Sequence, residues 1–415
     1  MLKIGAFLTF IVLSTTVNSQ CFYKNDSEKK LSPNARTNLY RNQMEFTLNL
    51  FNTINKAVPE DDNIFFSPFS VYHALLLGYF AASGQTEKSL KESLRISDEQ
   101  DKINLLMAYK VDKKERAFNN NSDSYEFTNA NKMFVDNELH LRQCLHDLLS
   151  SEIEALNFHD NPGESLDQIN NWVARITKNN IKELIPPDGV SQQTKLVLAN
   201  AAYFKGLWSS KFHVENTKKK IFYVSEERQT FVPFMRQKGA FHYSVNDDLG
   251  AQILELPYKG NDISMYILLP PYSNKDGVSN IIANLTPERL AAVVEEGYMG
   301  REVVVEIPKF TVEKSLPLRP ILENIGAGDL FKATATFSTL SEDSGILFDD
   351  ARHKAKIQID EEGTVAAAAT AIFGFRSSRP ADPTTFIANF PFVYIIYERP
   401  TNSILFMGVY RDPKK

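Results

Sequence analysis

The chain has 415 residues, of which 43% are hydrophobic and 23% are charged, with a formal net charge of -5. This composition is ordinary for a globular protein, and the length suits one large domain or two to three smaller ones. The net negative charge gives no electrostatic support to a general nucleic-acid-binding role. No linker, low-complexity block or internal repeat divides the chain.

The N-terminus has the pattern of a secretory signal peptide. Lys3 precedes an apolar run over residues 4–13, and small residues at 17–19 suit a signal peptidase. We predict that residues 1–19 are removed after Ser19. A membrane anchor is the alternative, but this run is too short to span a bilayer. We therefore expect a secreted, extracellular protein with no membrane association, beginning with a polar and flexible tail over residues 20–36.

Two cysteines and three glycosylation motifs fit that location. Cys21 and Cys144 are the two cysteines of the chain, and two cannot form a disulfide scaffold. The sequence leaves three states open for them: a disulfide between the two, two free thiols, or a disulfide from Cys21 to a second molecule. Asn25, Asn120 and Asn284 begin N-x-S/T motifs and are candidate glycosylation sites.

The first part of the chain predicts helices around one short strand. From Tyr40 onward, apolar residues recur at helical spacing up to Ile54. An apolar strand then ends at Ser67–Pro68, and the helix that follows is apolar on most faces, so it should be buried. Residues 98–118 predict a charged helix in which acidic residues interleave with basic ones. A solvated helix face is the favoured interpretation of that segment.

The middle of the chain predicts strands and two more helices. Residues 129–137 have the pattern of a strand ending in an Asp-Asn turn, and a helix should pass through Cys144. Ser165 and Gln168 have the spacing of a capping box, and Ile169 and Val173 begin a helical stripe. Residues 196–204 form a nearly continuous apolar strand, as expected when both faces are covered. Asn200 inside that strand needs a hydrogen-bonding partner.

Further strands are predicted downstream, at residues 251–258, 264–270, 303–310 and 353–360. Between the last of the alternating strands and residue 386 lies an unusual segment, EEGTVAAAATAIFGFRSSR, over residues 361–379. It is rich in small side chains first and bulky and basic afterwards. Small side chains can enter a sheet without overfilling its core, whereas an ordinary exposed helix or loop is the simpler interpretation.

Three segments resemble the serpin family: HKAKIQIDEEGTVAAAATA (353–371), NFPF (389–392) and LFMGVY (405–410). Residues 63–90 and 194–212 are also similar to that family. The resemblance implies one α+β domain over residues 37–415, with three β-sheets, about nine helices and an exposed reactive-centre loop at about 361–385. Asn389 and Phe390 depart from the acidic–basic pair that the family commonly carries before Pro391.

The resemblance also implies roles for single residues. It implies a movable "shutter" region in the sheet, formed by Ser67, Ser70, Asn200 and His353, in which the asparagine bonds the histidine. A simpler interpretation of the two serines, compatible with the first, is that they cap a helix. At the top of the sheet, the implied "breach" residues are Trp208, Lys309 and Glu361. As a surface pair, Lys309 and Glu361 would contribute only about 0–1 kcal/mol.

By this resemblance, the protein is an inhibitor of serine proteases and not an enzyme. A protease serine would attack the loop and form an acyl-enzyme, and the cut loop would enter the main sheet as a new strand. The segment that must enter first is the hinge, which comprises Glu361, Gly363, Thr364, Val365, Ala366, Ala367, Ala368 and Ala369. From Gly363 onward its side chains are small, and the segment contains no proline. This composition favours an inhibitor over a non-inhibitory ligand carrier or chaperone.

Family spacing places the reactive bond near Ser377. We predict Arg376–Ser377, because an arginine would pair with the acidic specificity pocket of a trypsin-like protease. Ser377–Ser378 is the alternative, and it would suit an elastase-like protease. Arg379–Pro380 is disfavoured because a proline after the scissile residue obstructs cleavage.

Other partners and chemistry have less support. In some serpins a basic helix binds a sulfated polysaccharide, and the corresponding residues here are Lys110, Lys113, Lys114 and Arg116. No G-x-S-x-G elbow, HExxH motif, Walker loop or dinucleotide fingerprint occurs, and no histidines have metal-ligand spacing. An unrelated hydrolase is therefore disfavoured, and we expect a monomer with no catalytic site, metal or cofactor, apart from the weakly supported heparin-like polyanion.

Overall fold

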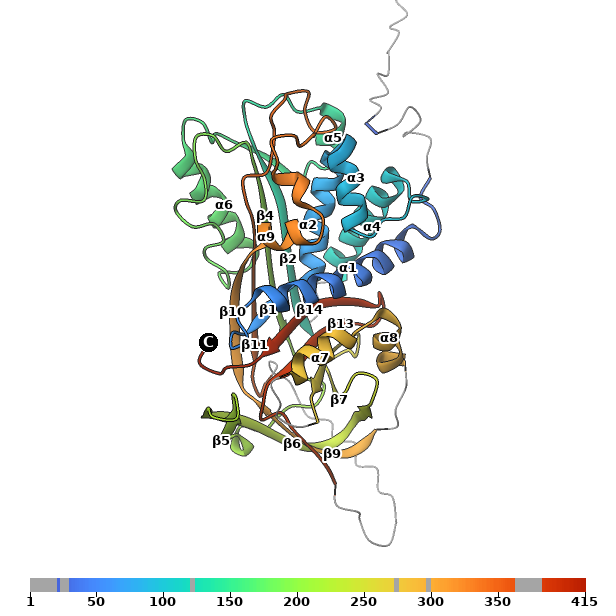
Figure 1. Ribbon diagram of the computed structural model, residues 1–415, viewed down its shortest axis with the longest axis vertical. Helices are drawn as coiled ribbons and strands as arrows, with labels where there is room; N and C mark the ends of the chain where they lie inside the picture. Colours follow the sequence, from blue (N-terminus) through green and yellow to red (C-terminus); the bar gives the residue numbers. More distant parts are fainter. Residues whose placement is uncertain (1–20, 23–29, 120–123, 272–275, 296–299, 363–382) are drawn as a thin grey trace, which may run out of the picture.

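The computed structural model describes residues 21–22, 30–119, 124–271, 276–295, 300–362 and 383–415 (Figure 1). Nine α-helices lie within these ranges. Their bounds are α1 (Ala35–Ala57), α2 (Pro68–Ala81), α3 (Gly84–Ser93), α4 (Lys102–Asn119), α5 (Gln143–Leu148), α6 (Pro162–Ile176), α7 (Gly277–Asn284), α8 (Pro287–Glu295) and α9 (Leu318–Asn324). Two short 3-10 helices cover Val214–Asn216 and Gly328–Phe331.

A five-stranded sheet runs along the length of the molecule. Its strand order is β10-β11-β4-β2-β3. The bounds are β2 (Tyr125–Asp136), β3 (Ile153–Leu156), β4 (Leu196–Gly206), β10 (Phe310–Pro317) and β11 (Ala351–Ile359). In Figure 1 these strands stand nearly vertical, with α6 on one side and α1 to α4 on the other. The apolar strand predicted at 196–204 is therefore confirmed as β4, covered on both faces.

The remaining nine strands are hydrogen-bonded into one continuous set, which consists of two sheets that meet at β6. β1 (Ile64–Phe66), β14 (Ser403–Tyr410), β13 (Phe392–Glu398), β8 (Ile263–Leu269) and β7 (Ala251–Pro257) lead to β6 (Gln229–Asn246). β9 (Arg301–Pro308), β12 (Thr384–Ile387) and β5 (Lys218–Tyr223) continue from β6. The 18-residue β6 pairs with β7 over residues 242–246 and with β9 over 234–241. The expected three sheets are present, and two of them share β6.

β4 and β11 are neighbours in the five-stranded sheet and run parallel. Their register extends from Leu198–Ala351 to Phe204–Ile357, and it places Asn200 opposite His353. Both outer neighbours are antiparallel, since β2 pairs with β4 and β10 pairs with β11 in that sense. A parallel junction whose two strands each have an antiparallel neighbour on the outer side leaves room for one antiparallel strand that could bond to both partners. We call this junction the seam.

Two apolar layers hold this sheet in place. The face toward α6 packs residues such as Phe134 and Ala199 against Ile169 and Val173. Every residue of α2 is buried, as its apolar sequence predicted, and it packs beneath the other face of the sheet. α2 begins at Pro68 because Ser67 caps it by accepting a hydrogen bond from the Ser70 amide, and proline is well tolerated in the first helical turn.

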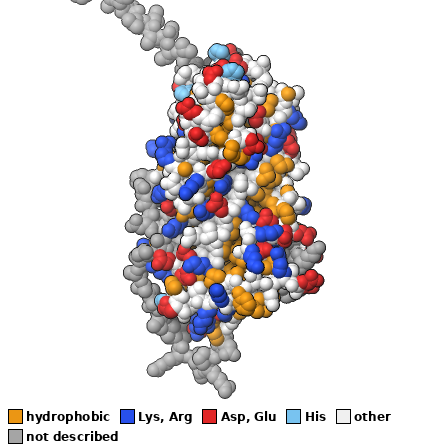
Figure 2. Space-filling view, turned by 90° about the vertical axis from the view of Figure 1, so that its left-hand side faces the viewer, with side chains coloured by type: hydrophobic (Ala, Val, Ile, Leu, Met, Phe, Trp, Pro, Cys, Tyr) orange, Lys and Arg blue, Asp and Glu red, His pale blue; other side chains and the backbone are white. Residues whose placement is uncertain are grey.

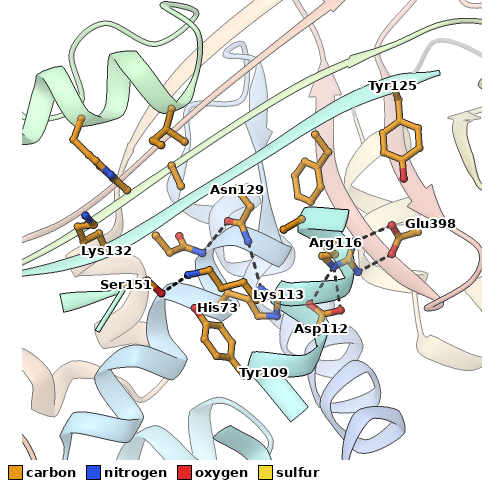
Figure 3. A pocket seen from close by; sticks show the side chains of 16 residues that line it. His73, Tyr109, Asp112, Lys113, Arg116, Tyr125, Asn129, Lys132, Ser151 and Glu398 are labelled. Atoms are coloured by element: carbon orange, nitrogen blue, oxygen red, sulfur yellow. Dashed lines mark hydrogen bonds and ion pairs between the residues drawn. The ribbon is translucent and has the colours of Figure 1, made fainter. Parts of the chain in front are cut away.

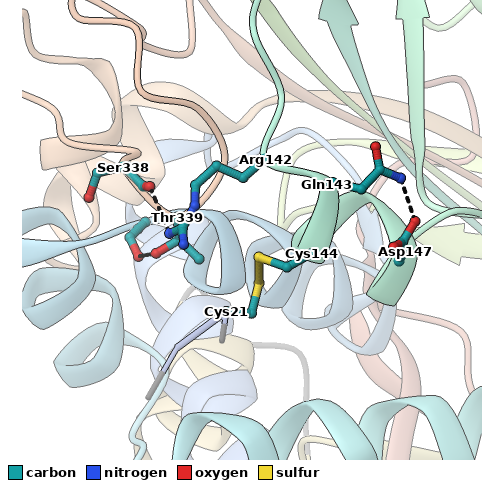
Figure 4. The surroundings of a disulfide bond; sticks show 8 residues. Cys21, Arg142, Gln143, Cys144, Asp147, Ser338 and Thr339 are labelled. Atoms are coloured by element: carbon teal, nitrogen blue, oxygen red, sulfur yellow. Dashed lines mark hydrogen bonds between the residues drawn. A yellow bond between two sulfur atoms is a disulfide. The ribbon is translucent and has the colours of Figure 1, made fainter. Parts of the chain in front are cut away.

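The N-terminal region differs from a simple polar tail. Within the segment 20–36, Cys21 is buried and forms a disulfide with Cys144 of α5, and α1 already begins at Ala35 (Figure 4). The two Cα atoms lie 5.5 Å apart, within the usual range for a disulfide. Of the three states that the sequence left open, the structure has the intramolecular disulfide.

The predicted capping box at the start of α6 is wrong. α6 begins at Pro162, so Ser165 lies within its first turn and does not cap it. The Ser165 hydroxyl donates instead to the Asn157 carbonyl, 2.9 Å away. Proline at the first position, with its fixed backbone angle, set the helix start four residues before the polar pattern suggested.

Within the residues that the structure describes, no helix is long and apolar enough to cross a membrane. The same residues contain no cluster of three or more His, Cys, Asp or Glu side chains that could hold a metal ion.

Candidate functional site: the seam between β4 and β11

The four shutter residues predicted from the sequence meet at the middle of the seam. Ser67 and Ser70 come from the start of α2, Asn200 from β4 and His353 from β11, and all four are buried. The Ser67 amide donates to His353 Nε2 at 2.9 Å, and the Ser67 hydroxyl donates to the Leu405 carbonyl at 2.7 Å. Ser67 therefore ties the start of α2 to both β11 and β14.

The hydrogen bonds define the state of His353. Because Nε2 accepts from the Ser67 amide, Nδ1 carries the proton and donates to Asn200 Oδ1. Desolvation by burial lowers the pKa of His353 to about 3, so the ring is neutral near pH 7. One neutral imidazole thus joins the two parallel strands by a side-chain hydrogen bond as well as by their backbones.

Two asparagines that the sequence analysis missed complete this network. Asn200 Nδ2 donates to the Ser70 hydroxyl at 2.7 Å and to Asn131 Oδ1 of β2. Asn129 Oδ1 accepts from Ser70 Oγ at 2.6 Å and from Asn131 Nδ2 at 2.8 Å. Residues two apart on a strand share a face, so the spacing of Asn129 and Asn131 within the predicted strand was the available signal.

The breach residues link the two strands at the end of the seam where β11 leads into Glu361. Trp208, just beyond β4, donates from Nε1 to the Asp360 carbonyl at 2.8 Å, and its ring stacks on Tyr258. The Phe212 amide donates to the Glu361 carbonyl at 3.2 Å. Any strand that enters the seam from this end must first break these two hydrogen bonds.

Glu361 is held more firmly than a surface residue. Its carboxylate, 6% exposed, accepts from Lys309 Nζ at 2.6 Å and from the Thr217 hydroxyl at 2.8 Å. Desolvation opposes ionisation, but the hydrogen bonds from Lys309, the backbone and Thr217 outweigh it, and the pKa of Glu361 is lowered. Lys309 is 44% exposed, so solvent screening keeps the pair itself modest.

Most of the other predicted site residues lie outside the part of the chain that the structure describes. The hinge residues 363–369 and the reactive-bond candidates Arg376, Ser377 and Ser378 lie outside the described residues, as do Asn25 and Asn120. Asn284 is the last residue of α7, and its partly buried position leaves the glycosylation motif at a helix end. Its carbonyl accepts from the Arg289 guanidinium at 2.9 Å.

Two of the four basic side chains of the possible polyanion site are engaged in ion pairs within the protein. Arg116 is half-buried and forms ion pairs with Asp112 and with Glu398 of β13 (Figure 3), and its guanidinium lies over the Phe69 ring. Lys113 pairs with Glu152. Lys110 and Lys114 remain exposed on α4. Figure 2, which views the molecule from the side on which α6 lies, shows blue and red side chains interspersed over that face.

The comparison with protein families decides the assignment. The family model described as "Serpin (serine protease inhibitor)" matches residues 41–413. The chain belongs to the serpin family. By family membership this serpin is not an enzyme, and serpins generally act on serine proteases.

Several relatives of this serpin are similar over most of their length. It is 39% identical over 395 residues to Serine protease inhibitor 88Ea of Drosophila melanogaster, covering 91% of this chain and 92% of the relative. It is 31% identical to human Antithrombin-III, covering 96% and 89%. Among solved structures, uncleaved ovalbumin superposes with a TM-score of 0.79 at 25% identity, over 90% of this chain and all of that one.

Proposed function

We propose that this serpin is a secreted inhibitor that traps a trypsin-like serine protease as a covalent acyl-enzyme, with Arg376–Ser377 as the reactive bond. The seam is the observation that carries the proposal. β4 and β11 lie side by side and parallel, and β11 leads directly through Glu361 into the small residues of the hinge. A cut hinge could therefore enter as an antiparallel strand bonded to both.

The chemistry begins as in ordinary proteolysis. The protease serine Oγ attacks the Arg376 carbonyl carbon, an ester forms, and the amide bond to Ser377 breaks, so that Ser377 leaves as a new amino terminus. Insertion of the hinge then carries the ester-linked protease away before water hydrolyses the ester. This step requires an uninserted state that is kinetically trapped. The hydrogen bonds at Trp208, Phe212 and His353 are the local barriers that the seam offers.

Secretion is supported by two independent features. The N-terminal apolar run ends with a predicted cleavage site at Ser19, and the disulfide from Cys21 begins two residues later. Disulfides persist in oxidising compartments such as the secretory pathway. A chain cleaved after Ser19 would retain both cysteines.

The test is to incubate the mature chain with an equimolar amount of trypsin and then to analyse the mixture by denaturing electrophoresis and mass spectrometry. We expect a complex that resists detergent and a released fragment that begins at Ser377. A fragment beginning at Ser378, obtained with elastase, would move the bond to Ser377–Ser378. Complete cleavage without a complex, and without a rise in thermal stability, would contradict inhibition by insertion.

A further inference from the structure

Lys102, the first residue of α4, has a buried ammonium group that contacts three helices. Its side chain is 2% exposed. Nζ donates to the Ala82 carbonyl at the end of α2, 2.7 Å away, and lies 3.0 Å from a carboxylate oxygen of Glu87 in α3. The centre of the Tyr79 ring of α2 lies 4.9 Å from Nζ. One cation therefore ties α2, α3 and α4 together.

A second aromatic ring, from the N-terminal segment, covers the same ammonium group. The centre of the Phe22 ring lies 5.1 Å from Lys102 Nζ. A cation over an aromatic face is attracted to it, and more strongly where water is excluded. Tyr79 is 2% exposed, whereas Phe22 is half-buried and the Glu87 side chain is 29% exposed. The ion pair thus lies just beneath the surface, and Phe22 is the ring on its solvent side.

A disulfide fixes Phe22 in this position. Its neighbour Cys21 is buried in the core and bonded to Cys144 of α5 (Figure 4). A dithiol reduces such a bond by exchange: the dithiol is oxidised to a disulfide, and the two cysteines become thiols. Without the covalent link, the contacts of Phe22 must hold the segment against its gain in conformational freedom. Reduction therefore favours loss of the cover over Lys102.

Access, and not basicity, keeps the amine of Lys102 unreactive in the oxidised protein. Desolvation by burial lowers the pKa of Lys102 to about 8, against the opposing effect of the Glu87 carboxylate. A fraction of the amine is thus neutral and nucleophilic near pH 7.5, yet no reagent reaches it beneath Phe22. An uncovered lysine would regain water and a more ordinary pKa, and would react as an exposed lysine does.

We propose that Lys102 is a modification site for acylating electrophiles that opens when the Cys21–Cys144 disulfide is reduced. In the open form the neutral amine attacks the carbonyl carbon of an acyl donor and an amide bond forms. The leaving group of the donor departs with the bonding electron pair, and the amine releases one proton. The site involves no residue of the reactive-centre loop and does not rest on the proposed protease target.

Acylation would dissolve the tie between the three helices. The product amide is neutral and keeps one N–H, so Glu87 would lose its cation and the Ala82 carbonyl its charged donor. The helix that ends at this contact, α2, begins with Ser67 and Ser70 of the shutter. Reduction followed by acylation would therefore loosen the far end of the helix that supports the seam.

The probe is sulfosuccinimidyl acetate, applied at pH 7.5 to the full mature chain in two forms. One form is oxidised, and the other is reduced with dithiothreitol and its thiols are blocked with iodoacetamide without denaturant. Mass spectrometry of digests gives the acetylation rate at each lysine. We expect Lys102 to react roughly tenfold faster or more after reduction, and Lys110, exposed on the same helix, to react equally in both forms. Equal rates for Lys102 would overturn the proposal.

A further lysine and two variants separate local opening from unfolding. Lys132 of β2 is half-buried, and its rate should not change on reduction; a parallel rise there would show general unfolding and overturn the proposal. Phe22→Ala with the disulfide intact should also accelerate acetylation of Lys102. Leu31→Ala, which shortens another apolar side chain of the N-terminal region, should leave it unchanged. If Phe22→Ala reacts no faster than wild type, Phe22 is not the cover and the proposal fails.

Discussion

His353 of β11 donates a hydrogen bond to Asn200 of β4 across the parallel strand pair in the interior of the five-stranded sheet. The same imidazole accepts from the Ser67 amide at the start of α2. Both ring nitrogens are thereby satisfied in a site with no solvent access. A strand inserted between β4 and β11 must separate His353 from Asn200, so this contact belongs to the uninserted state.

The first prediction concerns pH. His353 has a pKa of about 3 and His73 one of about 4, both lowered mainly by burial, whereas an unfolded histidine titrates near pH 6.5. The unfolded chain therefore binds more protons below pH 6.5. The stability that these neutral rings contribute is fully present above pH 6.5 and is lost as the pH falls from 6.5 toward 3.

Urea unfolding of the uncleaved chain, measured between pH 7.5 and pH 4, checks this. The free energy of unfolding should decline with a slope that includes about two histidine protons. His353→Gln should reduce that slope by about one proton. A wild-type slope that His353→Gln does not alter would contradict the buried, neutral assignment.

The second prediction concerns the end of the seam at Trp208. Trp208→Phe keeps an aromatic ring against Tyr258 but removes the donor to the Asp360 carbonyl. One hydrogen bond contributes about 0.5–1.5 kcal/mol, so spontaneous insertion of the uncut loop should accelerate by up to roughly tenfold. The measurement is the loss of inhibitory activity during incubation at 37 °C. Trp172→Phe changes the other tryptophan, which lies away from the seam, and its rate of loss should match wild type.

The sequence predicted the strands around the seam well because their patterns are local. The continuous apolar run at β4 and the alternation in β11 each identify a strand without knowledge of its neighbours. The pairing of these two strands is not local, since about 150 residues separate Asn200 from His353 along the chain. Only the resemblance to a family brought the two residues together before the structure did.

Side-chain partnerships that depend on packing were harder to predict. Arg116 resembles its exposed neighbours on α4 in the sequence, yet it is half-buried, because Glu398 of β13 supplies a second carboxylate from 282 residues away. The acceptor of Trp208 is a backbone carbonyl, and Ser67 donates to another, and no side-chain motif marks either carbonyl. The sequence also left the pairing of Cys21 open, because cysteine spacing does not determine connectivity.

The third prediction concerns the disulfide. Cys21 and Cys144 close a loop with a sequence separation of 123 residues, and the cysteine pair lies beside α5 in Figure 4. Replacing both by serine should lower the free energy of unfolding by about 2–4 kcal/mol, mainly because the unfolded chain gains freedom. Chemical denaturation of the oxidised protein, the reduced protein and the double variant provides the measurement. If reduction leaves the wild-type transition unchanged, the disulfide is not formed in solution.

The fourth prediction concerns hinge insertion. Ala367→Arg places a long, charged side chain in the segment that must enter the sheet, and burying an unpaired charge is strongly unfavourable. This variant should be cleaved by trypsin at the usual rate but form little covalent complex, so the number of inhibitor molecules consumed per protease should rise several-fold. Ala367→Val, whose side chain is small and apolar, should inhibit as wild type does. Normal complex yield from Ala367→Arg would count against insertion as the mechanism.

The last prediction identifies the reactive bond. Arg376→Ala removes the cation that would pair with the acidic specificity pocket of trypsin, a loss of about 2–5 kcal/mol for a buried charge pair. Complex formation with trypsin should then slow by roughly 30- to 4,000-fold and become undetectable in a standard assay. Arg379→Ala is the matched control, because Pro380 already protects that arginine from cleavage. Should Arg376→Ala retain full complex yield while Arg379→Ala loses it, the scissile residue would be Arg379, and the spacing argument that places the bond at Ser377 would be wrong.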